Sequence, residues 1–186
     1  MSFRSLLELD ARLSDQLRVA EKPGLLRNCA AFFAHSGDSW FWGVALIILW
    51  FMSNSAWKEW AVVEFVGISG LAAFVMAIKF SVRRKRPEGE WGGIYRNTDP
   101  HSFPSGHAAR TFLIAIVASA FVPAWLVIVL WVWAPLVSLA RVAMGVHYVS
   151  DVLAGAVVGM IVALIGLQIQ QPLLAWIVNL IGFALW

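Results

Sequence analysis

The sequence contains little charge and a single cysteine. Asp, Glu, Lys and Arg together account for 13% of the 186 residues, about half of the usual share. With only Cys29, the chain cannot carry an internal disulfide framework. Apolar residues make up 60% of it, which excludes intrinsic disorder. A domain of this size cannot bury so much apolar surface in one water-soluble core, so lipid must surround most of the chain.

The charge that remains is slightly basic, with 14 Lys and Arg against 11 Asp and Glu and a net charge of +3. The basic residues stand between apolar runs, so we do not expect a nucleic acid as a partner. The 11 Trp agree with a membrane, since Trp favours the boundary between lipid and water. We therefore expect an integral protein of the bacterial inner (cytoplasmic) membrane, with the lipid bilayer as a partner.

The N-terminal stretch has the pattern of an amphipathic helix. Leucines recur at steps of three and four residues, at Leu6, Leu9, Leu13 and Leu17. We interpret residues 3–20 as a helix lying in the membrane interface; the alternative is a helix packed on the rest of the protein. Acidic side chains interrupt the stretch, so we do not expect it to act as a secretory signal peptide.

Five later apolar runs have the length of membrane-spanning helices. They are predicted at residues 40–52 (extended back to Gly37), 60–80, 104–122, 124–139 and 148–167. Glu64 falls inside the second run, where we expect it to reach the membrane surface. Residues 168–172 should end the fifth helix, and the run 173–186 is either a short sixth crossing or a helix along the membrane. The fold class is therefore all-α: one domain over 1–186, with an interfacial helix and lead-in (1–35) before a bundle of five to six transmembrane helices (36–186).

The polar residues gather at the ends of these predicted helices. The second helix runs past Lys79 into a polar loop at 81–103, and the fourth ends at Arg141. The fifth begins near His147 and Asp151. Since successive crossings alternate in direction, these ends meet at one face of the membrane. Ionisable residues at membrane depth are costly to bury and are functional by default.

The residues at this face suit a bound phosphate. Lys79, Arg86 and Arg141 supply cations, and a guanidinium matches phosphate oxygens with paired hydrogen bonds. Ser105 and Gly106 stand at the start of the third helix, where free backbone N–H groups favour an anion. Each feature also has a structural interpretation: the run 83–86 is typical of a topology signal, and a serine here is typical of a helix N-cap.

Two histidines have different surroundings. His147 and Asp151 are four residues apart and share one helix face, so the carboxylate can orient the ring and strengthen its other nitrogen as a nucleophile. The alternative is a structural polar pair. His107 has no acidic residue at helical spacing and suits a general acid. Attack on phosphorus by His147 would give a phosphohistidine, which water then hydrolyses. We expect no metal and no cofactor.

Together these residues resemble the type 2 phosphatidic acid phosphatase superfamily, integral-membrane lipid phosphatases related to vanadium haloperoxidases. Its first motif, Lys, six residues, then Arg-Pro, is found from Lys79 to Pro87, and its second, Pro-Ser-Gly-His, at residues 104–107. The third is Ser-Arg, five residues, His, three residues, Asp. Arg141, His147 and Asp151 fit it, while Ala140 replaces the serine.

The resemblance implies a role for each matched residue. His147 is the nucleophile, Asp151 its partner and His107 the acid. Phosphate ligands are implied at Lys79, Arg86, Ser105, Gly106 and Arg141. The stretch 103–110 resembles the branch of the family that acts on isoprenoid diphosphates, and Arg110, one turn after His107, would be the further cation for a second phosphate. The alternative is that Arg110 anchors the chain to lipid headgroups.

The implied substrate is a membrane lipid with a phosphate head group. Its candidates are an isoprenoid diphosphate such as undecaprenyl diphosphate, phosphatidic acid, phosphatidylglycerophosphate and the phosphate of lipid A. Two other functions stay open: a vanadate-dependent haloperoxidase-like oxidoreductase and a non-catalytic protein that binds or transports lipid. The sequence also leaves open the side of the membrane that holds the site, and the oligomeric state.

Overall fold

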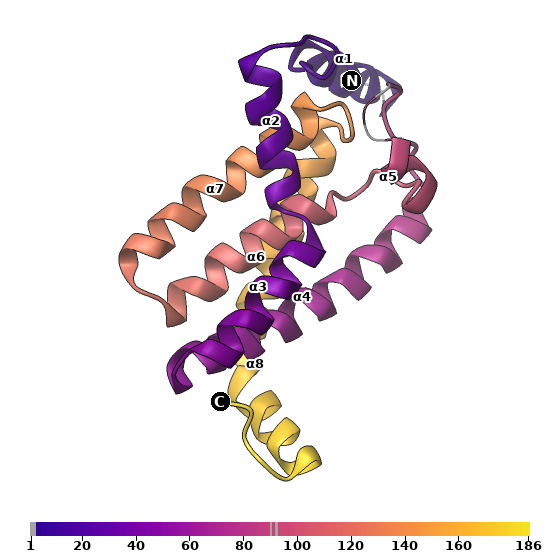
Figure 1. Cartoon of the computed structure of the whole chain (residues 1–186). Helices are drawn as coiled ribbons and strands as arrows, with labels where there is room; N and C mark the ends of the chain where they lie inside the picture. The colour runs from indigo at the N-terminus through magenta and orange to yellow at the C-terminus, as the bar shows by residue number, and fades with distance from the viewer. Residues whose placement is uncertain (1–2, 90, 92) are drawn as a thin grey trace.

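A computed structural model describes residues 3–89, 91 and 93–186 (Figure 1). Positions 1 and 2 of the predicted lead-in and positions 90 and 92 of the predicted loop lie outside the described residues. The described elements are α1 (Phe3–Gln16), α2 (Leu25–Ser36), α3 (Ser39–Met52), α4 (Ser55–Val82), α5 (Gly93–Thr98), α6 (Gly106–Phe121), α7 (Ala124–Ala143) and α8 (Val149–Ile181). The described residues contain no β-strand longer than one isolated bridge, so the all-α prediction is confirmed.

Within the part of the chain that the structure describes, three helices are long and apolar enough to cross a membrane: α4, α7 and α8. Helices α2 and α3 pass the same test as a pair, although they meet at an angle of 58°. Helix α6 is apolar but has 16 residues, fewer than a full span needs. These lengths agree with a helical membrane bundle, while the number of crossings and a position of α1 in the membrane interface stay predictions.

The ends of the predicted spans differ from the structure in two places. Residues of the expected lead-in form α2, which joins α3 through a break at Gly37 and Asp38. The predicted end of the fifth span at residues 168–172 was wrong, because α8 continues through Pro172 to Ile181. Glutamine is a good helix former, and membrane helices tolerate proline because their surroundings satisfy the freed backbone groups. The run 173–186 is therefore mostly the end of α8.

Glu64 also departs from expectation. Its side chain is fully buried rather than extended to the surface, and one carboxyl oxygen accepts a hydrogen bond of 3.0 Å from Trp60 Nε1. Trp60, one turn away, thus provides the hydrogen-bond partner that water at the membrane surface was expected to provide.

Helix α6 lies in the middle of the bundle and packs against α8, α7 and α4 (Figure 1). Its contact with α8 is close because glycines replace side chains there. A Cβ atom on Gly159 would lie 2.0 Å from the carbonyl oxygen of Ala109, and one on Gly155 would lie 2.4 Å from that of Ser105. This close approach fixes the start of α6, which carries the Pro-Ser-Gly-His motif, against the start of α8.

Substitution of Gly159 should therefore destabilise the bundle. We expect Gly159→Ala to cost about 1–3 kcal/mol or more, because backbone must shift to admit the methyl group. In detergent, the melting temperature should fall by about 4–10 °C. Gly166→Ala is the matched control on the same helix, since nothing lies within 4 Å of its Cβ position. Equal melting temperatures for both variants would show that the helices do not approach this closely.

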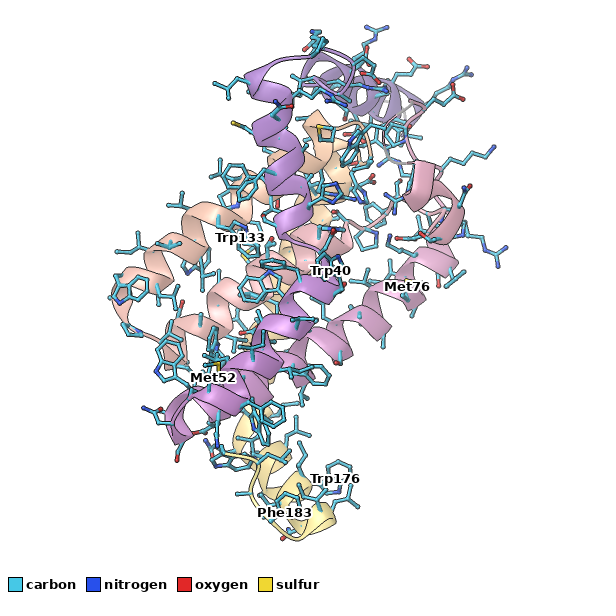
Figure 2. All side chains as sticks on the ribbon, in the orientation of Figure 1. Trp40, Met52, Met76, Trp133, Trp176 and Phe183 are labelled. Atoms are coloured by element: carbon cyan, nitrogen blue, oxygen red, sulfur yellow. The ribbon has the colours of Figure 1, made fainter. Side chains whose placement is uncertain are left out.

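The flanks of the bundle are covered by apolar side chains (Figure 2). Trp40 and Met52 on α3 are 69% and 83% exposed, and Trp176 on α8 is 60% exposed. A water-soluble protein rarely exposes a continuous apolar surface of this kind. The distribution supports lipid as the solvent around the bundle.

Helix α1 lies across the end of the bundle at which the α7–α8 turn is found (Figure 1). Its leucine stripe points outward, with Leu6, Leu9, Leu13 and Leu17 between 43% and 49% exposed. Its polar face packs on the protein instead, where Ser14 is buried and accepts a hydrogen bond of 3.0 Å from the N–H of Val149. The helix is thus docked on the bundle through polar residues, with its apolar face left outward.

Candidate active site

The predicted site residues come together at this end of the bundle, around a cavity of about 170 Å³ that we call the polar cavity. Its polar lining includes Lys79, Arg86, Asp99, Gly106, His107, Arg110, Arg141 and His147. The other wall is apolar and is formed mainly by α4, through Ile68, Leu71, Ala72, Val75 and Met76. Two predicted residues, Asp151 and Ser105, are not part of the lining. Asp151 contacts His147, which lines the cavity. Ser105 is the N-cap of α6, and its hydroxyl accepts a hydrogen bond from the Ala108 N–H.

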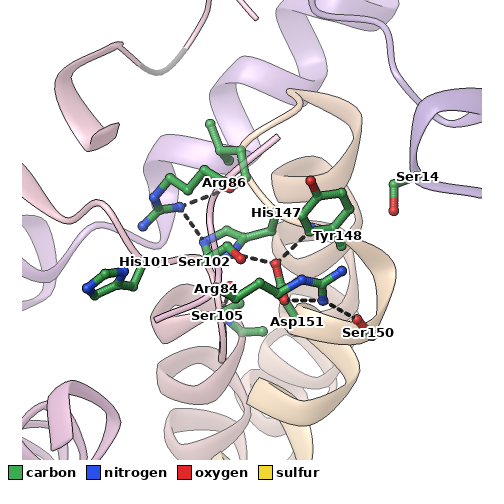
Figure 3. Close-up of polar contacts among 12 residues, drawn as sticks. Ser14, Arg84, Arg86, His101, Ser102, Ser105, His147, Tyr148, Ser150 and Asp151 are labelled. Atoms are coloured by element: carbon green, nitrogen blue, oxygen red, sulfur yellow. Dashed lines mark hydrogen bonds and ion pairs between the residues drawn. The ribbon is translucent and has the colours of Figure 1, made fainter. Parts of the chain in front are cut away.

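His147 lies in the short turn between α7 and α8, and its side chain is only 1% exposed. Arg86 Nη1 lies 3.1 Å from His147 Nε2 (Figure 3). A guanidinium can only donate, so Nε2 must present its lone pair and the ring proton must be on Nδ1. His147 Nδ1 faces Asp151 Oδ2 at 3.5 Å, which is long for a hydrogen bond. The ring therefore presents its unprotonated nitrogen to Arg86 and its N–H to the Asp151 carboxylate.

Burial lowers the pKa of His147 to about 3. The Asp151 carboxylate favours the protonated ring, but the positive charges of Arg86 and Arg141 oppose it. The ring is consequently neutral over the whole physiological pH range, which is the state that a nucleophile requires.

Two of the predicted phosphate ligands bind one carboxylate, which sequence reasoning missed. Lys79 Nζ and Arg86 Nη2 both donate to Asp99 Oδ2, the latter over 2.8 Å. Lys79 is 3% exposed, so the carboxylate compensates charges that are largely shielded from water. An anionic oxygen thus already lies between the two cations expected to bind a phosphate oxygen. An acidic residue inside a basic loop was the only sequence signal for Asp99.

His107 has a carboxylate partner from a distant part of the chain. Asp38 Oδ1 lies 2.7 Å from His107 Nε2, across 69 positions of sequence. Asp38 follows Gly37 at the break between α2 and α3, and its other oxygen lies 3.1 Å from His35 Nδ1. Helical spacing could not find this pair, because the two residues lie on separate helices. The only signal was an isolated acid beside a glycine inside an apolar region.

Two arginines of the cavity, Arg110 and Arg141, also bind the α2–α3 region. Arg110 donates from Nε and Nη2 to the carbonyl oxygen of Gly37, over 3.0 and 2.6 Å, and from Nη1 to Ser39 Oγ over 2.5 Å. Arg141, fully buried, donates to the carbonyl oxygen of Ala34 over 3.3 Å. Arg110 lies on the wall of the cavity, and its guanidinium binds the break that positions Asp38.

Apart from Asp99, the ionisable side chains that line the polar cavity are lysine, arginine and histidine. Within residues 3–89, 91 and 93–186, no three His, Cys, Asp or Glu side chains are grouped as metal ligands. Ala140, which replaces the serine of the third motif, is buried in an apolar cluster with Ala30 and Ala34 rather than on the cavity wall.

A family model for the PAP2 superfamily matches residues 58–174, which include all three motifs. The chain belongs to the PAP2 superfamily. A relative among characterised proteins, the decaprenylphosphoryl-5-phosphoribose phosphatase of Mycobacterium tuberculosis, is 30% identical over 159 residues, which cover 82% of this chain and 84% of the relative.

Two solved PAP2 structures have the same fold. LpxE of Aquifex aeolicus matches with a TM-score of 0.68 and 27% identity, covering 86% of this chain and 95% of that one. A phosphatidylglycerolphosphate phosphatase of Bacillus subtilis matches with a TM-score of 0.74 and 21% identity, covering 90% and 87%. Membership of the family, together with these relatives, identifies the chain as an integral-membrane lipid phosphatase.

Proposed function

We propose that this protein removes phosphate from a phosphomonoester or diphosphate lipid by two successive displacements at phosphorus, with His147 as the covalent nucleophile. The reaction needs neither metal nor cofactor, because the cavity supplies cationic side chains for the phosphoryl oxygens. His107, held by Asp38, is the proton donor.

The shape of the polar cavity carries this proposal. One end holds Lys79, Arg86 and Arg141 beside the two histidines, and the other wall is the apolar face of α4. A lipid phosphate likewise has a polar and an apolar part, since its negatively charged oxygens are attached to a hydrocarbon tail. The head would occupy the cationic end, while the tail would lie along α4 toward the lipid-covered flank.

In the first step, the lone pair of His147 Nε2 attacks phosphorus and a P–N bond forms. The bond between phosphorus and the leaving oxygen breaks, and His107 donates its proton to that oxygen. Arg86 Nη1 already lies 3.1 Å from Nε2, so its guanidinium lies next to the phosphoryl oxygens as they approach. Preorganised cations of this kind stabilise the charge of the transition state.

In the second step, water attacks the phosphohistidine from the side that the leaving group has vacated. His107, now neutral, takes a proton from this water, and the P–N bond breaks to restore His147. Free phosphate leaves, and both imidazoles return to their starting states. Asp151 faces the Nδ1–H throughout, so the ring keeps the tautomer that the reaction requires.

Arg110 bears on the type of substrate. It lines the cavity next to His107, where the second phosphate of a diphosphate would lie. Its guanidinium donates to Gly37 and Ser39, so a diphosphate has to share this group with the α2–α3 break. The M. tuberculosis relative is named for a decaprenylphosphoryl substrate, which supports an isoprenoid tail for this chain as well.

A panel of lipids tests the proposal. The purified protein is incubated, with EDTA present, with undecaprenyl diphosphate, phosphatidic acid, phosphatidylglycerophosphate and lipid A, and free phosphate is measured. We expect release from at least one lipid, and a selective loss of diphosphate hydrolysis in Arg110→Gln. Movement of lipid between vesicles without any phosphate release would contradict a hydrolase, and release only after a divalent ion is restored would contradict the metal-independent mechanism.

The low pKa of His147 predicts an unusual pH profile. Attack requires a neutral ring, and the ring stays neutral until the pH falls to about 3. The acid limb of kcat/KM should therefore lie below about pH 5, far from the ordinary histidine value near 6.5. Measurement of kcat/KM against pH, corrected for ionisation of the lipid phosphate, checks this; an acid limb at pH 6–7 that belongs to His147 would contradict it.

A further inference from the structure

Arg84 binds the carboxylate that orients His147. Its Nη1 donates to Asp151 Oδ1 over 2.8 Å and to Ser150 Oγ over 2.6 Å (Figure 3). The Tyr148 ring covers the guanidinium, with the ring centroid 4.0 Å from Cζ. Sequence reasoning placed Arg84 in a basic run typical of a topology signal, yet its side chain is only 18% exposed.

The other side of Arg84 is bound by the N-terminal helix. Asp10 of α1 accepts from Arg84 Nη2 over 2.7 Å, and the Asp10 side chain is 12% exposed. The same carboxylate accepts from the Ser150 N–H over 3.0 Å and from Ser150 Oγ over 2.5 Å. Arg84 therefore lies between two carboxylates, one from outside the bundle and one behind the nucleophile.

The carboxylate of Asp151 is fully buried and has three neighbours. Arg84 holds Oδ1, and the Tyr148 N–H donates to Oδ2 over 2.9 Å. The distance of 3.5 Å from Oδ2 to His147 Nδ1 is therefore set by the groups that hold the carboxylate, and Arg84 is the charged one among them. A shift of Arg84 would move the carboxylate or change how strongly it attracts the ring.

From these contacts we propose that Arg84 and Asp10 are positioning residues for His147, so that α1 helps to orient the nucleophile from outside the membrane bundle. This inference rests on the proposed role of His147. Asp10 fixes one side of the guanidinium, Arg84 fixes Asp151, and Asp151 faces the ring. Asp10 acts through Arg84, because its carboxylate binds Arg84 and Ser150 rather than Asp151 or His147.

Matched variants can separate positioning from simple stabilisation. Asp10→Asn keeps an oxygen for the Ser150 N–H but loses the charge that binds Arg84. Ser14→Ala removes another hydrogen bond from α1 to the start of α8, at Val149, without touching Arg84. Lys85→Gln removes one positive charge from the same loop at an exposed side chain. Arg84→Lys keeps the charge and loses the planar fork that reaches two carboxylates.

We expect Arg84→Gln and Asp10→Asn to lower kcat about 10–100-fold, the usual range for residues that orient a functional side chain from behind. KM should change less than about threefold. The double variant should be no slower than Arg84→Gln alone. Arg84→Lys should recover part of kcat, and the two controls should stay within about threefold of the parent. Orthovanadate, which takes a five-coordinate form against a nucleophile, should inhibit the slow variants less, while inhibition by inorganic phosphate stays unchanged.

Several results would overturn this inference. They are a multiplicative loss in the double variant, an equal loss in Ser14→Ala, or unchanged vanadate inhibition in Arg84→Gln. Melting temperature and elution in detergent confirm that each variant is folded, and Arg84→Lys tests the proposal if Arg84→Gln fails to fold. Failure of the proposed function would look different, because the parent itself would then release no phosphate from any lipid.

Discussion

Replacing His147 with alanine is expected to abolish phosphate release, with kcat falling about 10⁴-fold or more. The variant loses the imidazole nitrogen that forms the covalent bond in the proposed mechanism. KM should change much less, because the proposed phosphate ligands Lys79, Arg86 and Arg141 are still present. Initial rates with the best lipid of the panel, measured over a range of concentrations, separate the two constants.

The control for this loss is His35→Ala. His35 is a histidine near the same end of the bundle, but it lies outside the lining of the cavity, and its side chain is 56% exposed. The rate of phosphate release by His35→Ala should stay close to that of the parent protein. A His147→Ala variant that is folded and retains more than about a tenth of the parental kcat would exclude His147 as nucleophile.

The second large effect is expected for Asp38→Asn. The carboxylate lies 2.7 Å from His107 Nε2, where it orients that ring and favours its protonated form for the proposed role as acid. Its loss should lower kcat about 10²–10³-fold, within the range of general acid catalysis. The loss should shrink for a lipid analogue with a phenolic leaving group, because such an oxygen departs without help from a proton.

The two oxygens of Asp38 provide the control. His35 contacts the other oxygen from the exposed side, so His35→Ala leaves the contact with His107 in place. Thermal unfolding of Asp38→Asn shows whether the α2–α3 break survives the substitution. An equal loss of kcat with natural and phenolic substrates would mean that Asp38 supports the fold rather than proton transfer.

Much of the fold and the cavity followed from sequence, because the signals were local. Apolar runs of membrane length predicted the helices now seen as α4, α7 and α8. The spacing of His147 and Asp151 predicted a shared helix face; the two do face each other, but His147 lies in the turn just before α8. The common membrane face of these residues predicted that they meet Lys79 and Arg86. The depth of burial was harder to predict: Glu64 is fully buried rather than extended to the surface.

The partners that sequence reasoning missed are all distant in sequence. Asp38 lies 69 positions from His107, and Asp10 lies 74 positions from Arg84. No periodicity within one helix can report such pairs, since they depend on how the α2–α3 break and α1 dock on the bundle. The continuation of α8 through Pro172 was missed for a related reason, because proline is disruptive only where its surroundings leave backbone groups unsatisfied.

The most direct test is to trap the covalent intermediate. The protein is mixed with lipid carrying a ³²P label on the phosphate, quenched in alkali within the first turnover, and digested for peptide mapping. We predict a base-stable, acid-labile label on the peptide that contains His147, absent in His147→Ala and longer-lived in His107→Ala, whose water lacks a general base. Full turnover with no label on the protein at any quench time would contradict a phosphohistidine at this site.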